Sequence, residues 1–159
     1  MLAFPLRMQL CFCALLLAGS SVGNIVNAQF DGMRWALPTD ANMVVLIDAE
    51  KLFGSRLADK ERWDGKRKAA YEAGVSALAP DVSQVMLGGL LDLELGQSVW
   101  EVALARFSEG RDISSVARRF GGSVDRIGER MAARLPNDIF VVQVTDNLIG
   151  THIPANRQS

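Results

Sequence analysis

The fold is decided by residues 82–107, VSQVMLGGLLDLELGQSVWEVALARF. Apolar side chains occupy most odd-numbered positions of the first half, and from Trp100 onward they occupy even-numbered positions of the second half. Alternation with a period of two is typical of a β-strand that buries one face. A short turn around Gly96 separates the halves, so we predict an antiparallel hairpin with strands over 82–95 and 99–107.

Another strand and two helices are predicted around this hairpin. The continuous apolar run 43–47 is typical of a buried central strand. Asp64 is predicted to cap a helix that runs to about Ala79, and Asp112 is predicted to cap a second helix that ends at Gly121. The first helix carries one apolar stripe at helical spacing, formed by Tyr71, Val75 and Leu78.

The stretch 123–135 is compatible with two structures. As a helix it would align four apolar side chains, those of Val124, Ile127, Met131 and Leu135. As a hairpin it would turn at Gly128-Glu129 and place short strands on either side. We favour the hairpin. Two further strands, 139–144 and 148–153, are predicted to follow it.

The resulting order is strand, helix, strand, strand, helix and then more strands. This order predicts an α+β protein in which an antiparallel sheet carries two main helices on one face. The expected arrangement is a ferredoxin-like βαββαβ core extended by a C-terminal β-meander. We expect a lead-in segment over 29–42, a single domain over 43–154 and a polar tail over 155–159.

Residues 1–28 have the pattern of a secretory signal peptide. Arg7 precedes an apolar core over 8–19, and Val26-Asn27-Ala28 supplies small residues at the cleavage site. The apolar core is too short to span a bilayer comfortably. We therefore expect cleavage near Ala28, no stable membrane anchor after cleavage, and an exported protein that is periplasmic or extracellular.

Charge and cysteine content narrow the functional classes. Cleavage would remove Cys11 and Cys13, the only cysteines, and leave a chain without disulfides. Of the 17 Lys and Arg residues only one lies in the leader, so the remainder carries 16 of them against 18 Asp and Glu. Such a near-neutral chain has no long-range attraction for nucleic acid. The residues Arg126, Arg130 and Arg134 are interleaved with acids and are interpreted as ordinary charged faces.

No catalytic or metal-binding motif stands out after the leader. His152 is the only histidine, and its place in the predicted strand points it toward solvent. If His152 belonged to a Ser-His-Asp triad, the nucleophile would be Ser114, Ser115 or Ser123. One histidine without cysteines is a poor set of ligands for zinc, and no metal or cofactor is predicted. Asp48 and Glu50 are carboxylate candidates for a calcium site, but a turn explains them better. Asp92 and Glu94 could act as an acid–base pair, but a solvated sheet face explains them better.

The tryptophans are the binding candidates. Trp100 belongs to the apolar face of its strand, whereas Trp35 and Trp63 lie in predicted loops. Large aromatic side chains can form a platform for a peptide or a sugar. Trp35 and Trp63 are therefore the predicted binding residues.

Several short motifs occur in an order that resembles a group of exported bacterial proteins of uncharacterised function. They are Leu37-Pro38-Thr39-Asp40-Ala41-Asn42, the strand Met43-Val44-Val45-Leu46-Ile47-Asp48, Ala105-Arg106-Phe107 and Val116-Ala117-Arg118. The resemblance covers residues 37–155 and implies an exported α+β module with a ferredoxin-like core. It also implies a hairpin over 123–135, which adds to the preference stated above. It supplies no catalytic residues.

Three functions are compatible with these features. The leading hypothesis is an exported non-catalytic module that binds an envelope protein or peptide through its sheet face or sheet edge. A small-ligand carrier would show an apolar pocket near Trp35 or Trp63. A secreted hydrolase would use carboxylates or a Ser–His152 pair.

Overall fold

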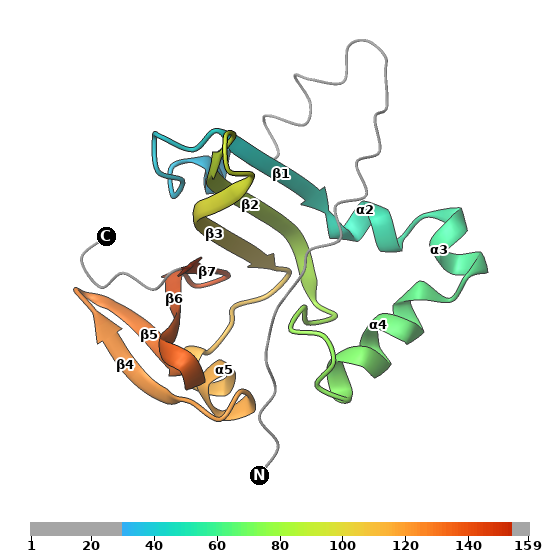
Figure 1. The fold of residues 1–159 in the computed structure, drawn as a ribbon. Coiled ribbons are helices and arrows are strands. Elements are labelled where there is room, and N and C mark those ends of the chain that lie inside the picture. Colours follow the sequence, from blue (N-terminus) through green and yellow to red (C-terminus); the bar gives the residue numbers. More distant parts are fainter. Residues whose placement is uncertain (1–29, 154–159) are drawn as a thin grey trace.

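The computed structural model describes residues 30–153, with the backbone alone at residue 137. The predicted signal peptide, 1–28, and polar tail, 155–159, lie outside this range. The strands are β1 (Met43–Asp48), β2 (Val82–Asp92), β3 (Gln97–Phe107), β4 (Ser123–Ile127), β5 (Arg130–Leu135), β6 (Ile139–Thr145) and β7 (Leu148–Ile153). They form one sheet in the order β1-β2-β3-β7-β6-β5-β4, and all neighbours are antiparallel (Figure 1). This arrangement confirms the predicted α+β class and antiparallel sheet.

Both predicted hairpins are present. β2 pairs with β3, but β2 ends at Asp92 because its carboxylate accepts the backbone N–H groups of Glu94 and Leu95 at 2.9 and 3.0 Å. The two leucines of this turn, expected on the apolar face of the strand, are exposed. β4 and β5 pair along their length, so the hairpin and not the helix forms over 123–135.

The ferredoxin-like arrangement does not agree with the observed strand pairing. A split βαβ core contains parallel strands joined by helical crossovers. Here β1 is an edge strand that pairs antiparallel with β2, because the chain returns to the neighbouring position in the sheet. The expectation of a central strand over 43–47 is also wrong. The end of the run is covered on both faces, because Leu46 and Ile47 pack into different hydrophobic clusters, whereas Val44 is half-exposed.

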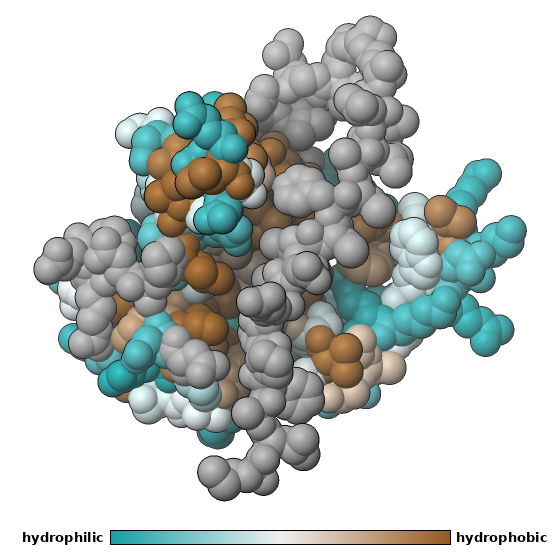
Figure 2. Space-filling model, viewed as in Figure 1, coloured by the Kyte–Doolittle hydropathy of each residue, from teal (hydrophilic) through white to brown (hydrophobic). Residues whose placement is uncertain are grey.

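Three short helices join β1 to β2: α2 (Ala49–Phe53), α3 (Arg56–Lys60) and α4 (Trp63–Glu72). They form an arm that projects from the sheet in Figure 1, and Figure 2 shows hydrophilic side chains extending from it. The predicted helix 64–79 is too long: α4 ends at Glu72, and Gly74 takes a left-handed φ of 73°. The predicted cap is also wrong, because α4 begins at Trp63 after Arg62, and Asp64 lies within the first turn. Val75, expected to face inward, is 83% exposed. None of the helices within 30–153 has the length and apolar character needed to span a bilayer.

The two apolar stripes of the central hairpin lie on opposite faces of the sheet. Because Met86 pairs with Leu104 and Leu87 with Ala103, even positions of both strands share one face and odd positions share the other over 84–90 and 100–106, between two shifts in register. The odd face packs against α5 (Ile113–Arg119) and against the segment that enters β2. The even face therefore needs a different cover.

Residues 30–37 provide that cover. Phe30 and Met33 are fully buried in one cluster with Met86, Val102, Leu104 and Leu148. Leu37 sits directly over Gly88, where a Cβ atom would lie 2.6 Å from Leu37 Cδ2. Residues 30–37 of the predicted lead-in are thus part of the hydrophobic core, and the central hairpin is covered on both faces.

The cap of α5 agrees with the prediction. The Asp112 carboxylate accepts hydrogen bonds from the Ser114 hydroxyl and, at 3.0 Å, from the Ser114 backbone N–H. A carboxylate at this position satisfies free N–H groups of the first turn. Gly121 follows the helix with a left-handed φ of 69°, and η1 (Pro136–Asp138) separates β5 from β6.

Replacing Ser114 with alanine should raise the pKa of Asp112 toward its ordinary value. The hydrogen bond from the Ser114 side chain is the main cause that holds the pKa of Asp112 low. A lowered pKa means that the charged cap stabilises the fold above the unfolded-state pKa, and that this contribution is lost as pH falls through the folded-state pKa. A carboxyl-carbon NMR titration of both proteins measures the change, and identical titration curves would contradict the assigned cause.

Candidate functional site

A cavity lies on the even face of the sheet, beside the 30–37 segment. Its volume is about 280 Å³. We call it the Trp35 groove, and it is lined by Trp35, Ala36, Pro38, Val102, Leu104, Arg130, Val142, Val144, Gly150, Thr151 and His152. Most of these lining side chains are apolar, and the floor comes from even positions of β3, β6 and β7.

Trp35 forms one wall of the groove and is held in place. Its indole Nε1 donates a hydrogen bond to the Gly32 carbonyl oxygen at 3.0 Å. The helical residues just before it are anchored by the buried Phe30 and Met33. The side chain is nevertheless 58% exposed. A large, oriented and accessible aromatic surface is a feature of binding sites.

Arg130 lies at the start of β5 and brings a positive charge to the same wall. Its guanidinium carbon lies 5.7 Å from the centroid of the Trp35 ring, within the range of a cation–π contact. Its Nη1 donates a hydrogen bond to the Val144 carbonyl oxygen at 2.6 Å, which fixes the charge beside the floor. The five ion pairs among residues 30–153 do not include Arg130.

His152 lines the opposite part of the groove and does not simply point to solvent, as its strand position predicted. Its ring stacks on Trp100, with centroids 5.9 Å apart and planes inclined by 21°. The Trp100 Nε1 in turn donates to Asp40 Oδ2 at 3.4 Å. Trp100 also packs against the even-face core, in agreement with its predicted apolar face.

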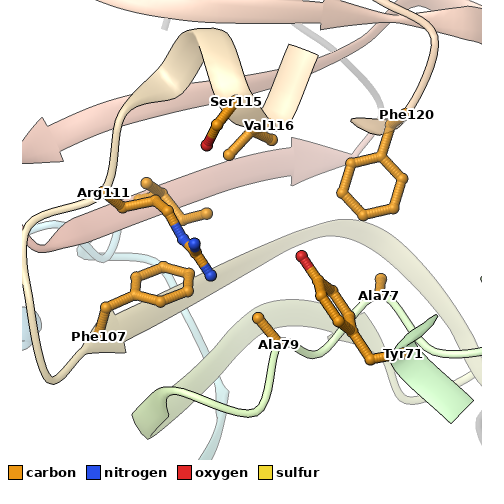
Figure 3. Close-up of a pocket in the computed structure, with 9 residues that line it drawn as sticks. Tyr71, Ala77, Ala79, Phe107, Arg111, Ser115, Val116 and Phe120 are labelled. Carbon is orange, nitrogen blue, oxygen red and sulfur yellow. The ribbon is translucent and has the colours of Figure 1, made fainter. Parts of the chain in front are cut away.

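Another cavity, which is small, lies on the odd face between the end of the helical arm and α5 (Figure 3). Its volume is about 50 Å³, which suits ordered water and not a larger ligand. Arg111, on its rim, pairs with Asp81 at 2.7 Å, and Arg119 stacks on Tyr71 at 3.6 Å from the ring centroid. These contacts stabilise the packing of the arm against the region of α5.

The hydrolase candidates are not brought together. His152 lines the Trp35 groove on the even face, whereas Ser115 lines the small cavity on the odd face. The hydroxyl groups of Ser114 and Ser115 donate to Asp112, the second at 2.6 Å to its carbonyl oxygen. Ser123 is exposed at the start of β4.

The remaining sequence candidates have structural roles. Asp48 caps α2 and pairs with Lys51 at 2.9 Å, and Asp92 caps the β2–β3 turn as described above. Trp63 begins α4 on the arm and lies outside both cavities. Within residues 30–153, no three side chains of His, Cys, Asp or Glu are grouped to hold a metal ion.

Of the residues in the groove, sequence reasoning singled out Trp35 but missed Arg130. The signal for Arg130 is weak, because an arginine among interleaved charges is usually solvated. Its place beside Trp35 depends on the pairing of β5 with β6 and on the docking of residues 30–37, which lie far from Arg130 in the sequence.

No protein family model, no curated protein and no solved structure matches this chain. Function is therefore inferred from the chemistry of the groove.

Proposed function

We propose that the chain is an exported, non-catalytic binding module whose Trp35 groove holds part of an envelope protein or peptide. The observation that carries the proposal is the groove itself: an apolar floor flanked by an oriented, accessible tryptophan and a fixed arginine. Aromatic and arginine side chains around an apolar pocket are typical of the residues that dominate protein–protein binding energy. The leader pattern over 1–28 supports export.

The size of the groove favours a partner protein over a small-ligand carrier. Its volume of about 280 Å³ lies just below the roughly 300–1,000 Å³ that small-molecule sites occupy. Trp35 on its rim remains largely accessible, so a small ligand would not be enclosed. A single large side chain of a partner fits this space better.

A secreted hydrolase is the weaker candidate. The separation of His152 from Ser115 by the sheet argues against a Ser–His pair, since such a pair requires hydrogen-bond contact. Ester or glycoside turnover that is lost in His152→Ala would overturn the non-catalytic proposal.

Trp35→Ala should weaken binding of the envelope partner at least about 30-fold, the effect of a tryptophan at the centre of an interface. The chain, expressed with its own leader and purified, is used to capture partners from an envelope fraction, and the affinity of each captured protein is then measured by calorimetry. Trp63→Ala is the matched control, because Trp63 lies outside the groove. Equal affinities of the wild type and Trp35→Ala would contradict the proposal.

A further inference from the structure

We infer that the Trp35 groove recognises a large apolar side chain next to a carboxylate on an extended peptide. This inference rests on the proposed function and specifies the chemistry of the partner. It follows from the placement of one fixed positive charge at the edge of an apolar floor.

The floor selects the apolar part of the peptide. Val102, Leu104, Val142 and Val144 are aliphatic and come from β3 and β6, the two strands that flank β7. Trp35 on one side and His152 on the other add flat ring surfaces. A leucine or aromatic side chain placed here would be removed from water on several sides, which is favourable in proportion to its buried apolar area.

Arg130 selects the charged part. A guanidinium group has five N–H donors, and one is used by the Val144 carbonyl oxygen. No carboxylate within 30–153 forms an ion pair with it. The residues that line the groove include no carboxylate, and Asp40 accepts a hydrogen bond from Trp100, which stacks on His152. The groove therefore has a positive end at Arg130, and charge complementarity favours an acidic residue there.

The test is a selection of random heptapeptides on the immobilised chain, purified after expression with its own leader. We expect the enriched peptides to combine Phe, Trp or Leu with a neighbouring Asp or Glu. The same selection on Arg130→Glu should replace the acidic preference by Lys or Arg, because the charge at the groove is inverted. Changing the acid of the best peptide to its amide should weaken binding to the wild type about tenfold.

Arg126→Glu is the matched control. It makes the same charge change on the same hairpin, but Arg126 pairs with Met131, whose side chain packs against α5 on the odd face of the sheet. Its peptide preference should remain that of the wild type. Circular dichroism melts of both variants show that they are folded before the selections are compared.

The outcomes separate the two proposals. Apolar peptides without an acidic preference, or a preference that Arg130→Glu leaves unchanged, would overturn the inference and leave the binding module standing. Failure to enrich any peptide whose binding depends on Trp35 would overturn both.

Two further measurements test other occupants of the groove. Light scattering that shows a dimer lost in Trp35→Ala would place a second copy in the groove. Binding of 2-naphthoate as tightly as the best peptide would indicate a small-ligand carrier. Either result would also overturn the inference.

Discussion

Phe30→Ala should lower the free energy of unfolding by about 3–5 kcal/mol, the usual loss for a buried phenylalanine. Phe30 is only 2% exposed, although it lies just two residues after the predicted cleavage site at Ala28. It packs in one cluster with Met33, Met86 and Leu148, so its removal would leave a cavity on the even face of the sheet. Urea unfolding followed by circular dichroism measures the loss.

Trp35→Ala is the control within the same segment. Its side chain is 58% exposed, so its removal should cost less than about 1 kcal/mol. A small loss for both variants would mean that residues 30–37 do not belong to the core. Because Trp35→Ala is expected to be folded when its affinity is measured, a loss of binding in this variant would not be caused by unfolding.

Gly122→Ala should destabilise the protein by about 3 kcal/mol, at the upper end of the usual cost of overpacking. A Cβ atom at this position would lie 2.3 Å from the Arg134 carbonyl oxygen and 3.1 Å from its carbonyl carbon. These are backbone atoms of β5, and they cannot rotate away as a flexible side chain would. The β4–β5 pairing would have to shift, and Arg130 at the start of β5 would shift with it.

The neighbouring glycine gives the matched control. Gly121 has a left-handed φ of 69°, and no atom lies within 4 Å of its Cβ position. Gly121→Ala should therefore cost only the roughly 1–2 kcal/mol of placing a Cβ in left-handed backbone. Thermal or urea unfolding of both variants separates the two effects. If Gly121→Ala costs as much as Gly122→Ala, the close contact with Arg134 is not the cause.

Elements with strong local signals could be predicted from the sequence. The β2–β3 and β4–β5 hairpins and the Asp112 cap of α5 each depend on alternation, a turn or a capping side chain within a few residues. The first long helix was predicted poorly. The stripe of Tyr71, Val75 and Leu78 has helical spacing, but the chain leaves the helix after Glu72 and exposes Val75.

The candidate site was predicted in part for a similar reason. Trp35 could be named because a large aromatic residue in a predicted loop is unusual. Arg130 and His152 looked like solvated residues, and neither has a neighbour in sequence that places it near Trp35. Their grouping depends on strand register, which brings β3, β7, β6 and β5 together in that order.

The sequence by itself determined the α+β class, the positions of the hairpins and the expectation of an export leader, because each depends on the pattern of side chains along a short stretch. Only the tertiary structure decided which stripe of the central hairpin lies on which face, since the register pairs even with even positions over 84–90 and 100–106. It also decided that residues 30–37 cover the even face and that β1 lies at the edge of the sheet. The hydrophobic effect does not depend on separation in sequence, so a distant segment can cover an apolar sheet face as well as a neighbouring one.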